Sequence, residues 1–307
     1  FGSSHAFGYK LDRTLHVLLS AMLRINVLSI LAIGIAADEC EVLLLQTQTG
    51  LQRRKPWDDH VYWVGVHHKA GSHLLRNVMR HAFDGLGAGY SCHTLPAPLP
   101  GSFVTSVGHA HYCPEVPDCN ILWDCHGSLD SFNAARARGN GSARGIHIVR
   151  DPARMLASAY CYHHRGEEPD NPLSHLPEML SMGPVEGMMT LWPDMLPLLD
   201  DMTTLFADKD GLYHVRYENL TESSASFDLQ IGGIFDFLFG GLISRSEMEL
   251  IAEAAKKEDL NRDQSITKGS TRHTNSDECT DAALQAQSSL GQKVLTELED
   301  LKVRLGY

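Results

Sequence analysis

The sequence predicts an α/β protein with a parallel central sheet flanked by helices. Short apolar runs that are typical of buried strands alternate with segments in which apolar residues recur every three or four positions, as on one helix face. Strands that alternate with helices form parallel sheets that are covered on both faces. Charged and polar residues follow several of these strands, at the edge where such sheets bind ligands.

The first strand and helix lie on either side of a short polar loop. Residues 61–66 (VYWVGV) form an apolar run with β-branched and aromatic side chains, which indicates a buried strand. Residues 67–71 form the loop, and the helix is expected to begin at Ser72. Its predicted buried face consists of Leu74, Leu75, Val78, Met79, Ala82 and Phe83.

Three further strands are predicted at residues 120–123, 145–149 and 212–215. After the second of these, Asp151 can cap a helix whose first position is Pro152. Further helices are expected at 227–239 and 247–257, and His163 with His164 is interpreted as a polar helix end. Residues 167–205 have no single period, so both a lid or acceptor-binding insertion and a helical excursion on the surface fit them.

The composition fits one principal globular domain and excludes some classes of function. The chain has 307 residues, of which 43% are hydrophobic and 21% charged. A net charge of -12 argues against a nucleic-acid-binding protein, which needs a basic surface. Seven widely spread cysteines do not resemble a small disulfide scaffold, and both free thiols and disulfides fit them.

The first 55 residues are expected to form a separate N-terminal segment, followed by the main domain at 56–307. Residues 15–37 are apolar but are interrupted by Arg24 and Asn26, so they suit a signal or membrane anchor and a packed helix equally well. Sites for N-glycosylation at Asn140 and Asn219 fit secretion but also arise by chance. A cytoplasmic location and a Golgi or secretory membrane-associated one therefore both remain open.

The loop before the first long helix carries the sequence Lys69-Ala70-Gly71-Ser72. A helix N-terminus offers unpaired N–H groups, a glycine allows an anion to approach the backbone, and a lysine adds a full positive charge. This loop therefore predicts a phosphate-binding site. The lysine precedes the glycine, whereas the nucleotide-triphosphatase loop GxxxxGK[ST] has the reverse order, which argues against ATP hydrolysis by that route.

A second anion-binding motif begins at Arg150, where another predicted strand ends. Its guanidinium is a permanent cation with several donors, and Ser158, two helical turns later, adds a hydroxyl. Taken alone, an arginine paired with a neighbouring carboxylate is the more common explanation. Two cationic sites at two strand ends favour one ligand with two anionic groups.

Together the two motifs resemble the nucleotide-binding signature of the sulfotransferases that use 3'-phosphoadenosine 5'-phosphosulfate (PAPS), over about residues 61–274. The resemblance implies a P-loop-like sulfotransferase fold in which the loop cradles the 5'-phosphosulfate and the second motif holds the 3'-phosphate. It implies that Tyr217, in a Tyr-Glu-Asn-Leu string, lies near the adenine. A late basic loop is matched more weakly, because the family's trailing Gly-Asp-Trp is absent. The implied donor-binding residues are Lys69, Ala70, Gly71, Ser72, His73, Arg150, Ser158, Tyr217, Lys268, Gly269 and Arg272.

The resemblance also implies in-line transfer of a sulfuryl group to a hydroxyl or amine, with Lys69 stabilising the leaving nucleotide. In the family's cytosolic branch the base is a histidine at a strand end ahead of the binding arginine, a position that His126 fits. His109 and His111 are the runner-up pair, and Asp124 is a carboxylate alternative.

We expect a small-molecule or glycan acceptor, no nucleic-acid partner and no metal, with membrane contact possible through residues 15–37. Five residues separate Cys113 from Cys119 and Cys119 from Cys125, which does not match the short ligand pairs of structural zinc sites. The sequence says nothing about oligomeric state. An inactive sulfotransferase-like nucleotide-binding protein and a nucleotide kinase are the alternative functions.

Overall fold

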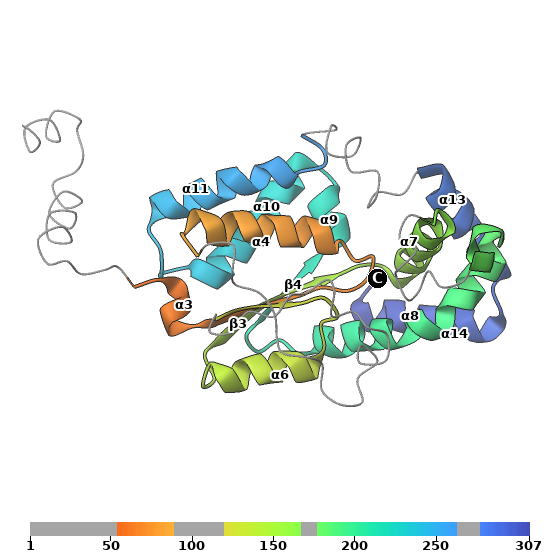
Figure 1. Ribbon diagram of the computed structural model, residues 1–307, viewed down its shortest axis with the longest axis horizontal. Helices are drawn as coiled ribbons and strands as arrows, with labels where there is room; N and C mark the ends of the chain where they lie inside the picture. The colour runs from red at the N-terminus through yellow and green to blue at the C-terminus, as the bar shows by residue number, and fades with distance from the viewer. Residues whose placement is uncertain (1–53, 89–119, 167–176, 263–276) are drawn as a thin grey trace, which may run out of the picture. The chain divides into compact units, whose positions relative to one another are not determined.

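The computed structural model describes residues 54–88, 120–166, 177–262 and 277–307 (Figure 1). At its centre lies a parallel sheet with the strand order β2-β1-β3-β4. The strands are β1 (Val61–Gly65), β2 (Ile121–Asp124), β3 (Ala143–Val149) and β4 (Leu212–Arg216). The prediction of an α/β fold with a parallel sheet flanked by helices is confirmed.

Helices cover both faces of this sheet (Figure 1). One face packs against α4 (Ser72–Gly85) and α10 (Ser224–Phe239), with α11 (Arg245–Ala255) lying against α4. The other face packs against α6 (Leu129–Arg138) and α8 (Pro184–Ala207). The remaining elements are α3 (Pro56–Asp59), α7 (Pro152–His164), α9 (Tyr217–Thr221), α13 (Asp277–Ala286), α14 (Gln292–Leu305) and the short 3-10 helices Pro177–Leu180, Lys256–Glu258 and Gln287–Ser289.

The periodicity of the sequence correctly located the buried face of α4. The helix begins at Ser72, and its buried side chains are Leu74, Leu75, Val78, Met79, Ala82 and Phe83, the six that were predicted. The start of α7 is also as predicted, because the Asp151 carboxylate accepts hydrogen bonds from the backbone N–H groups of Ala153, at 2.8 Å, and of Arg154. Pro152 occupies the first turn, where it costs no hydrogen bond.

Helix α8 occupies most of the segment that showed no single period. It contains Pro193 and Pro197 and buries Met188, Leu191 and Met195. These side chains belong to the main hydrophobic core, so this part of the segment is a layer of the fold rather than a surface excursion. Residues 167–176 of that segment lie outside the described residues.

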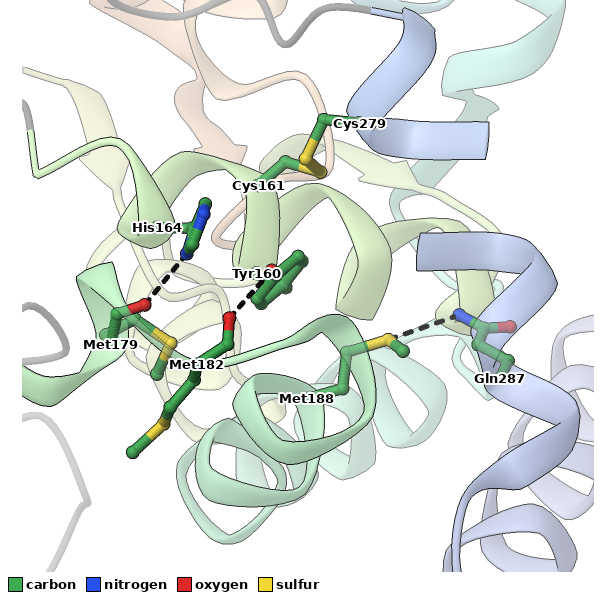
Figure 2. Close-up of a disulfide and its surroundings, with 8 residues drawn as sticks. All are labelled: Tyr160, Cys161, His164, Met179, Met182, Met188, Cys279 and Gln287. Carbon is green, nitrogen blue, oxygen red and sulfur yellow. Dashed lines mark hydrogen bonds between the residues drawn. A yellow bond between two sulfur atoms is a disulfide. The ribbon is translucent and has the colours of Figure 1, made fainter. Parts of the chain in front are cut away.

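A disulfide between Cys161 and Cys279 joins α7 to α13 across 118 residues of sequence (Figure 2). Beside it, the Tyr160 hydroxyl donates to the carbonyl of Met182 at 3.0 Å. The side-chain amide of Gln287 also donates to the carbonyl of Ala153 at 2.6 Å. Helix α7, which follows β3, is therefore attached to the C-terminal helices by both covalent and polar contacts.

In the described part of the chain, none of the helices has the length and apolar character needed to cross a lipid bilayer. Residues 15–37, predicted as an anchor or a packed helix, lie outside it. The division of the chain near residue 56 stays a prediction.

Candidate functional site

The loop between β1 and α4 has an unusual backbone. Lys69 and Gly71 both have positive φ angles, of 64° and 96°. Gly71 is the N-cap of α4, and no side-chain hydrogen bond caps the helix there. The Ser72 hydroxyl instead donates back to the carbonyl of His67 at 2.8 Å, and the Ala70 N–H donates to the same carbonyl at 3.1 Å. The first turn of α4 is thus left available for an external acceptor such as an anion.

Arg150, which follows β3, reaches directly to this loop. Its Nη1 atom donates to the carbonyl of Lys69 at 2.7 Å, and its guanidinium carbon lies 4.3 Å from the centre of the Tyr217 ring. Burial lowers the pKa of Arg150, whereas Tyr217 and Glu218 act in the opposite direction. The Nε atom is buried and has no hydrogen-bond partner among the described residues. A buried cationic donor without an acceptor is costly, which suits a site that receives an anion.

Tyr217 closes the site from the side of β4. A Cβ atom placed on Gly71 would lie 2.4 Å from Cδ2 of Tyr217, so the aromatic ring and the loop backbone are in close contact. Two features therefore require a glycine at position 71. Its positive φ disfavours other residues, and the Tyr217 ring leaves no room for a side chain. The structure brings Gly71, Arg150 and Tyr217 together from three separate segments.

Helix α7 contributes the side chains next to Lys69. The Lys69 ammonium lies over the ring of Tyr162, which is 3% exposed. Ser158, one turn earlier on the same helix, is buried. Lys69 is therefore directed toward the helix that begins just after Arg150.

His126 lies just beyond β2, beside the strand that leads into the loop. Strand β2 pairs with β1 so that Asp124 is opposite Gly65, and the Gly127 N–H donates to the carbonyl of Val66 at 2.9 Å. The backbone N–H of His126 donates to Oδ1 of Asp124 at 3.0 Å.

Asp124 is tied into the same strand end. Its other carboxylate oxygen accepts a hydrogen bond from the Ser131 hydroxyl. Burial raises the pKa of Asp124. Burial also raises the pKa of Asp201, on α8, to about 6, with Asp124 acting in the same direction. Asp201 was not predicted from the sequence, because no motif in the residues around it indicates a position near the site.

The other predicted residues have different surroundings. His73 is exposed in the first turn of α4. His163, interpreted as part of a polar helix end, is 2% exposed and lies 3.1 Å, Nε2 to Nε2, from His68. The position at the end of α7 is as predicted, but the His163 ring stacks on the ring of His68 and is buried. His109, His111, Lys268, Gly269 and Arg272 lie outside the described residues.

A link from the C-terminal end of the chain to Arg150 was also missed. The Tyr307 hydroxyl donates to Oε2 of Glu218 at 2.7 Å, and Oε1 of Glu218 accepts from the Asp151 N–H at 3.1 Å. Arg216 donates to the carbonyl of Leu305 at 2.6 Å. No sequence pattern marks Tyr307 as a neighbour of the second motif, because the contact depends on where α14 packs.

The described residues contain no group of three or more histidine, cysteine, aspartate or glutamate side chains that could hold a metal ion. The features of the site that suit an anion are two cationic side chains, a helix N-terminus and hydroxyl groups. Which of the predicted residues bind a ligand stays a prediction.

Comparison with known proteins gave a weak structural likeness. No family model and no curated protein matches the sequence. Among solved structures, the chain resembles the mouse sulfotransferase SULT7A1 complexed with PAP, at 19% sequence identity and a TM-score of 0.37. The match covers 69% of this chain and 68% of that one. Because this likeness is weak, the assignment of an α/β fold with a parallel sheet is based on the strand order and register alone.

Proposed function

We propose that this chain is a sulfotransferase that transfers a sulfuryl group from PAPS to a hydroxyl or amine of a small-molecule or carbohydrate acceptor. The observation that carries the proposal is the 2.7 Å hydrogen bond from Arg150 Nη1 to the Lys69 carbonyl. This hydrogen bond joins the two sequence motifs into one cationic site. PAPS, which has anionic groups at both ends, requires such a site.

The residues around this contact fit the donor nucleotide. The uncapped N-terminus of α4 at Gly71 and Ser72 suits the 5'-phosphosulfate, since it combines free N–H groups with the positive end of the helix. Arg150, with its buried unsatisfied Nε, and Ser158 suit the 3'-phosphate. Tyr217, in contact with Gly71 and Arg150, supplies an aromatic surface for the adenine.

Two side chains would carry the chemistry. PAPS supplies the sulfuryl group and leaves as an anionic nucleotide. Lys69 stabilises the negative charge that develops on the bridging oxygen, and its contact with Tyr162 restrains the ammonium. His126, held at the end of β2 by its N–H bond to Asp124, accepts the proton that the acceptor oxygen or nitrogen loses. No covalent enzyme intermediate is needed.

The test is transfer of radiolabelled sulfate from PAPS to a panel of alcohols, phenols, amines and saccharides. Lys69→Ala should lower turnover about 10²- to 10³-fold, the usual effect of removing one charge-stabilising group. Lys293→Ala is the matched control, because Lys293 is a surface lysine whose side chain is 86% exposed. Unchanged turnover in Lys69→Ala would reject the mechanism. Binding of PAP without transfer to any acceptor would instead support the inactive nucleotide-binding protein.

A further inference from the structure

Three histidines, which we call the histidine row, form a hydrogen-bonded chain that begins at the loop between β1 and α4. His67 follows β1, His147 lies in β3 and His214 lies in β4. The Nε2 atoms of His67 and His147 are 2.8 Å apart, and the Nδ1 atoms of His147 and His214 are 3.0 Å apart. At the far end, Nε2 of His214 lies 2.6 Å from the carbonyl oxygen of Asp208. His147 and His214 are opposite each other in the β3–β4 pairing.

The carbonyl of Asp208 fixes the tautomer of every ring in the row. A carbonyl only accepts hydrogen bonds, so Nε2 of His214 carries a proton and, in a neutral ring, Nδ1 does not. Nδ1 of His147 must then donate to it, which leaves Nε2 of His147 as an acceptor. Nε2 of His67 consequently donates, and Nδ1 of His67 is a bare acceptor. That atom is buried and has no hydrogen-bond partner among the described residues.

Burial keeps the row neutral near physiological pH. His67 and His147 are both 0% exposed. Burial lowers the pKa of His67 to about 3 and that of His147 well below its ordinary value, and it also lowers the pKa of His214. His214 differs from the other two because its contact with the Asp208 carbonyl and the nearby Asp208 carboxylate both favour its charged form.

The charged groups around the row place any added charge at its outer end. Lys209 opposes protonation of both His147 and His214, whereas Asp208, itself paired with Arg136 at 2.9 Å, favours it at His214 only. The uncharged ring of Phe206 also packs against the ring of His214. At His67, which contacts His147, burial is the cause of the lowered pKa.

We propose that the histidine row is a proton relay between the loop and Asp208, which moves a proton taken up at His67 outward as charge on His214. The proton binds to Nδ1 of His67, the Nε2 proton of His67 passes to Nε2 of His147, and the Nδ1 proton of His147 passes to Nδ1 of His214. Three N–H bonds form and two break, so one proton is gained. His214 becomes the imidazolium, and Nδ1 of His67 changes from acceptor to donor.

This change takes place at the residue that anchors the loop. The carbonyl of His67 accepts the hydrogen bonds of Ser72 and Ala70. The protonated row carries one more positive charge, on His214, and one more N–H donor, on His67. An anion in the loop should therefore favour the protonated row, and by linkage protonation of the row should strengthen binding of that anion in the loop. This consequence rests on the proposed function, under which sulfuryl transfer also releases a proton beside the loop, whereas the relay itself rests on the geometry of the row alone.

The tautomers can be measured on the unmodified protein by long-range ¹⁵N–¹H NMR of labelled histidine side chains. At a pH of about 7.5, above the ordinary histidine pKa, we expect Nε2–H for His67, Nδ1–H for His147 and Nε2–H for His214. As the row gains a proton at lower pH, His214 should show two N–H groups while His67 and His147 exchange their tautomers. An Nε2–H tautomer of His147 at the higher pH, or protonation of His214 without the exchange, would overturn the relay.

The coupling to the loop is tested with PAP binding by calorimetry in buffers of different ionisation enthalpy. When the pH is lowered from about 7.5 to about 6, the affinity for PAP should increase at least about 5-fold more in the wild type than in His214→Gln. The wild type should also take up more protons on binding PAP. His81→Gln is the control, because the ring of His81 contacts Glu258 and not the row. Equal proton uptake in the wild type and His214→Gln would overturn the coupling. If the wild type binds no PAP, the proposed function fails while the NMR measurement still decides the relay.

Discussion

The guanidinium of Arg150 donates to the backbone carbonyl of Lys69 across 81 residues of sequence. This contact places the cation that follows β3 against the loop that follows β1, and these two strands are neighbours in the sheet. Because the carboxyl ends of parallel strands meet at one edge, two motifs that are far apart in the chain form one site.

Gly71→Ala should destabilise the protein and weaken nucleotide binding. The substitution puts a side chain on a residue with φ of 96° and brings Cβ to 2.4 Å from the Tyr217 ring. We expect a loss of about 1–3 kcal/mol in the free energy of unfolding, measured with urea. Gly232→Ala is the control, because its Cβ would meet nothing within 4 Å and it lies inside α10. That change should stabilise the protein by about 0.5–1 kcal/mol, and an equal effect of both variants would contradict this interpretation.

Tyr217 should matter for its ring and not for its hydroxyl group. The Arg150 guanidinium lies 4.3 Å from the ring centre. Tyr217→Leu should therefore lower PAP affinity by about 3- to 30-fold, as expected for the loss of a cation–π contact and a stacking surface, while Tyr217→Phe keeps most of it. Titration calorimetry of both variants is the measurement. A larger loss in Tyr217→Phe than in Tyr217→Leu would show that the hydroxyl is the important group.

The histidine row should make stability depend on pH below about 6.5, the ordinary histidine pKa. Folding lowers the pKa values of the three histidines, so below this pH the unfolded chain binds more protons than the folded chain. The stability from this effect is complete above the unfolded pKa and is lost as the pH falls toward the folded values.

Urea unfolding at several pH values, compared between the wild type and His214→Gln, isolates this contribution. The half-buried carboxyl of Asp201, whose pKa is raised to about 6, acts with the opposite sign but is the same in both proteins. The His214→Gln substitution removes one ring whose pKa is lowered in the folded state. It should therefore reduce the fall in the free energy of unfolding on acidification by up to about 1.4 kcal/mol per pH unit. Identical pH dependences in the two proteins would contradict the neutral state of the partly buried His214 ring.

The disulfide between Cys161 and Cys279 should contribute strongly to stability. It closes a loop of 118 residues, and breaking such a bond typically costs about 2–5 kcal/mol. Cys125 is disulfide-bonded as well, so the double variant Cys161→Ala/Cys279→Ala isolates this bond better than a reductant does. Unfolding by urea measures the loss. Peptide mapping without reduction should recover the linked pair, and free thiols at both positions would refute the bond.

The local structure was largely predictable from the sequence. The buried face of α4, the capping of α7 by Asp151 and the four strands follow from patterns within short segments. Helices α6, α13 and α14 were not predicted, and α8 was not distinguished from a surface excursion. The periodicity of α8 is obscured because Pro193 and Pro197 lie inside a helix whose apolar side chains are also numerous.

The site was predictable only where a motif carries its own chemistry. Lys69, Gly71 and Arg150 belong to recognisable strings, and the structure brings them together. The histidine row was not predictable, because His67, His147 and His214 come from three separate segments and meet only when β3 pairs with β4 and β1. A histidine within or just after each of three apolar strands is the signal that could have indicated it, since buried polar side chains require partners.

The proposed function requires that Arg150 binds the 3'-phosphate of a nucleotide whose 5' end lies in the Lys69 loop. The most direct measurement is the ratio of the dissociation constants of adenosine 5'-monophosphate and PAP for the wild type and Arg150→Gln, with Arg245→Gln, at a side chain that is 91% exposed, as the control. We predict a preference for PAP of about 10- to 100-fold in the wild type and the control, reduced to near unity in Arg150→Gln. An undiminished preference in Arg150→Gln, or no preference in the wild type, would contradict the account.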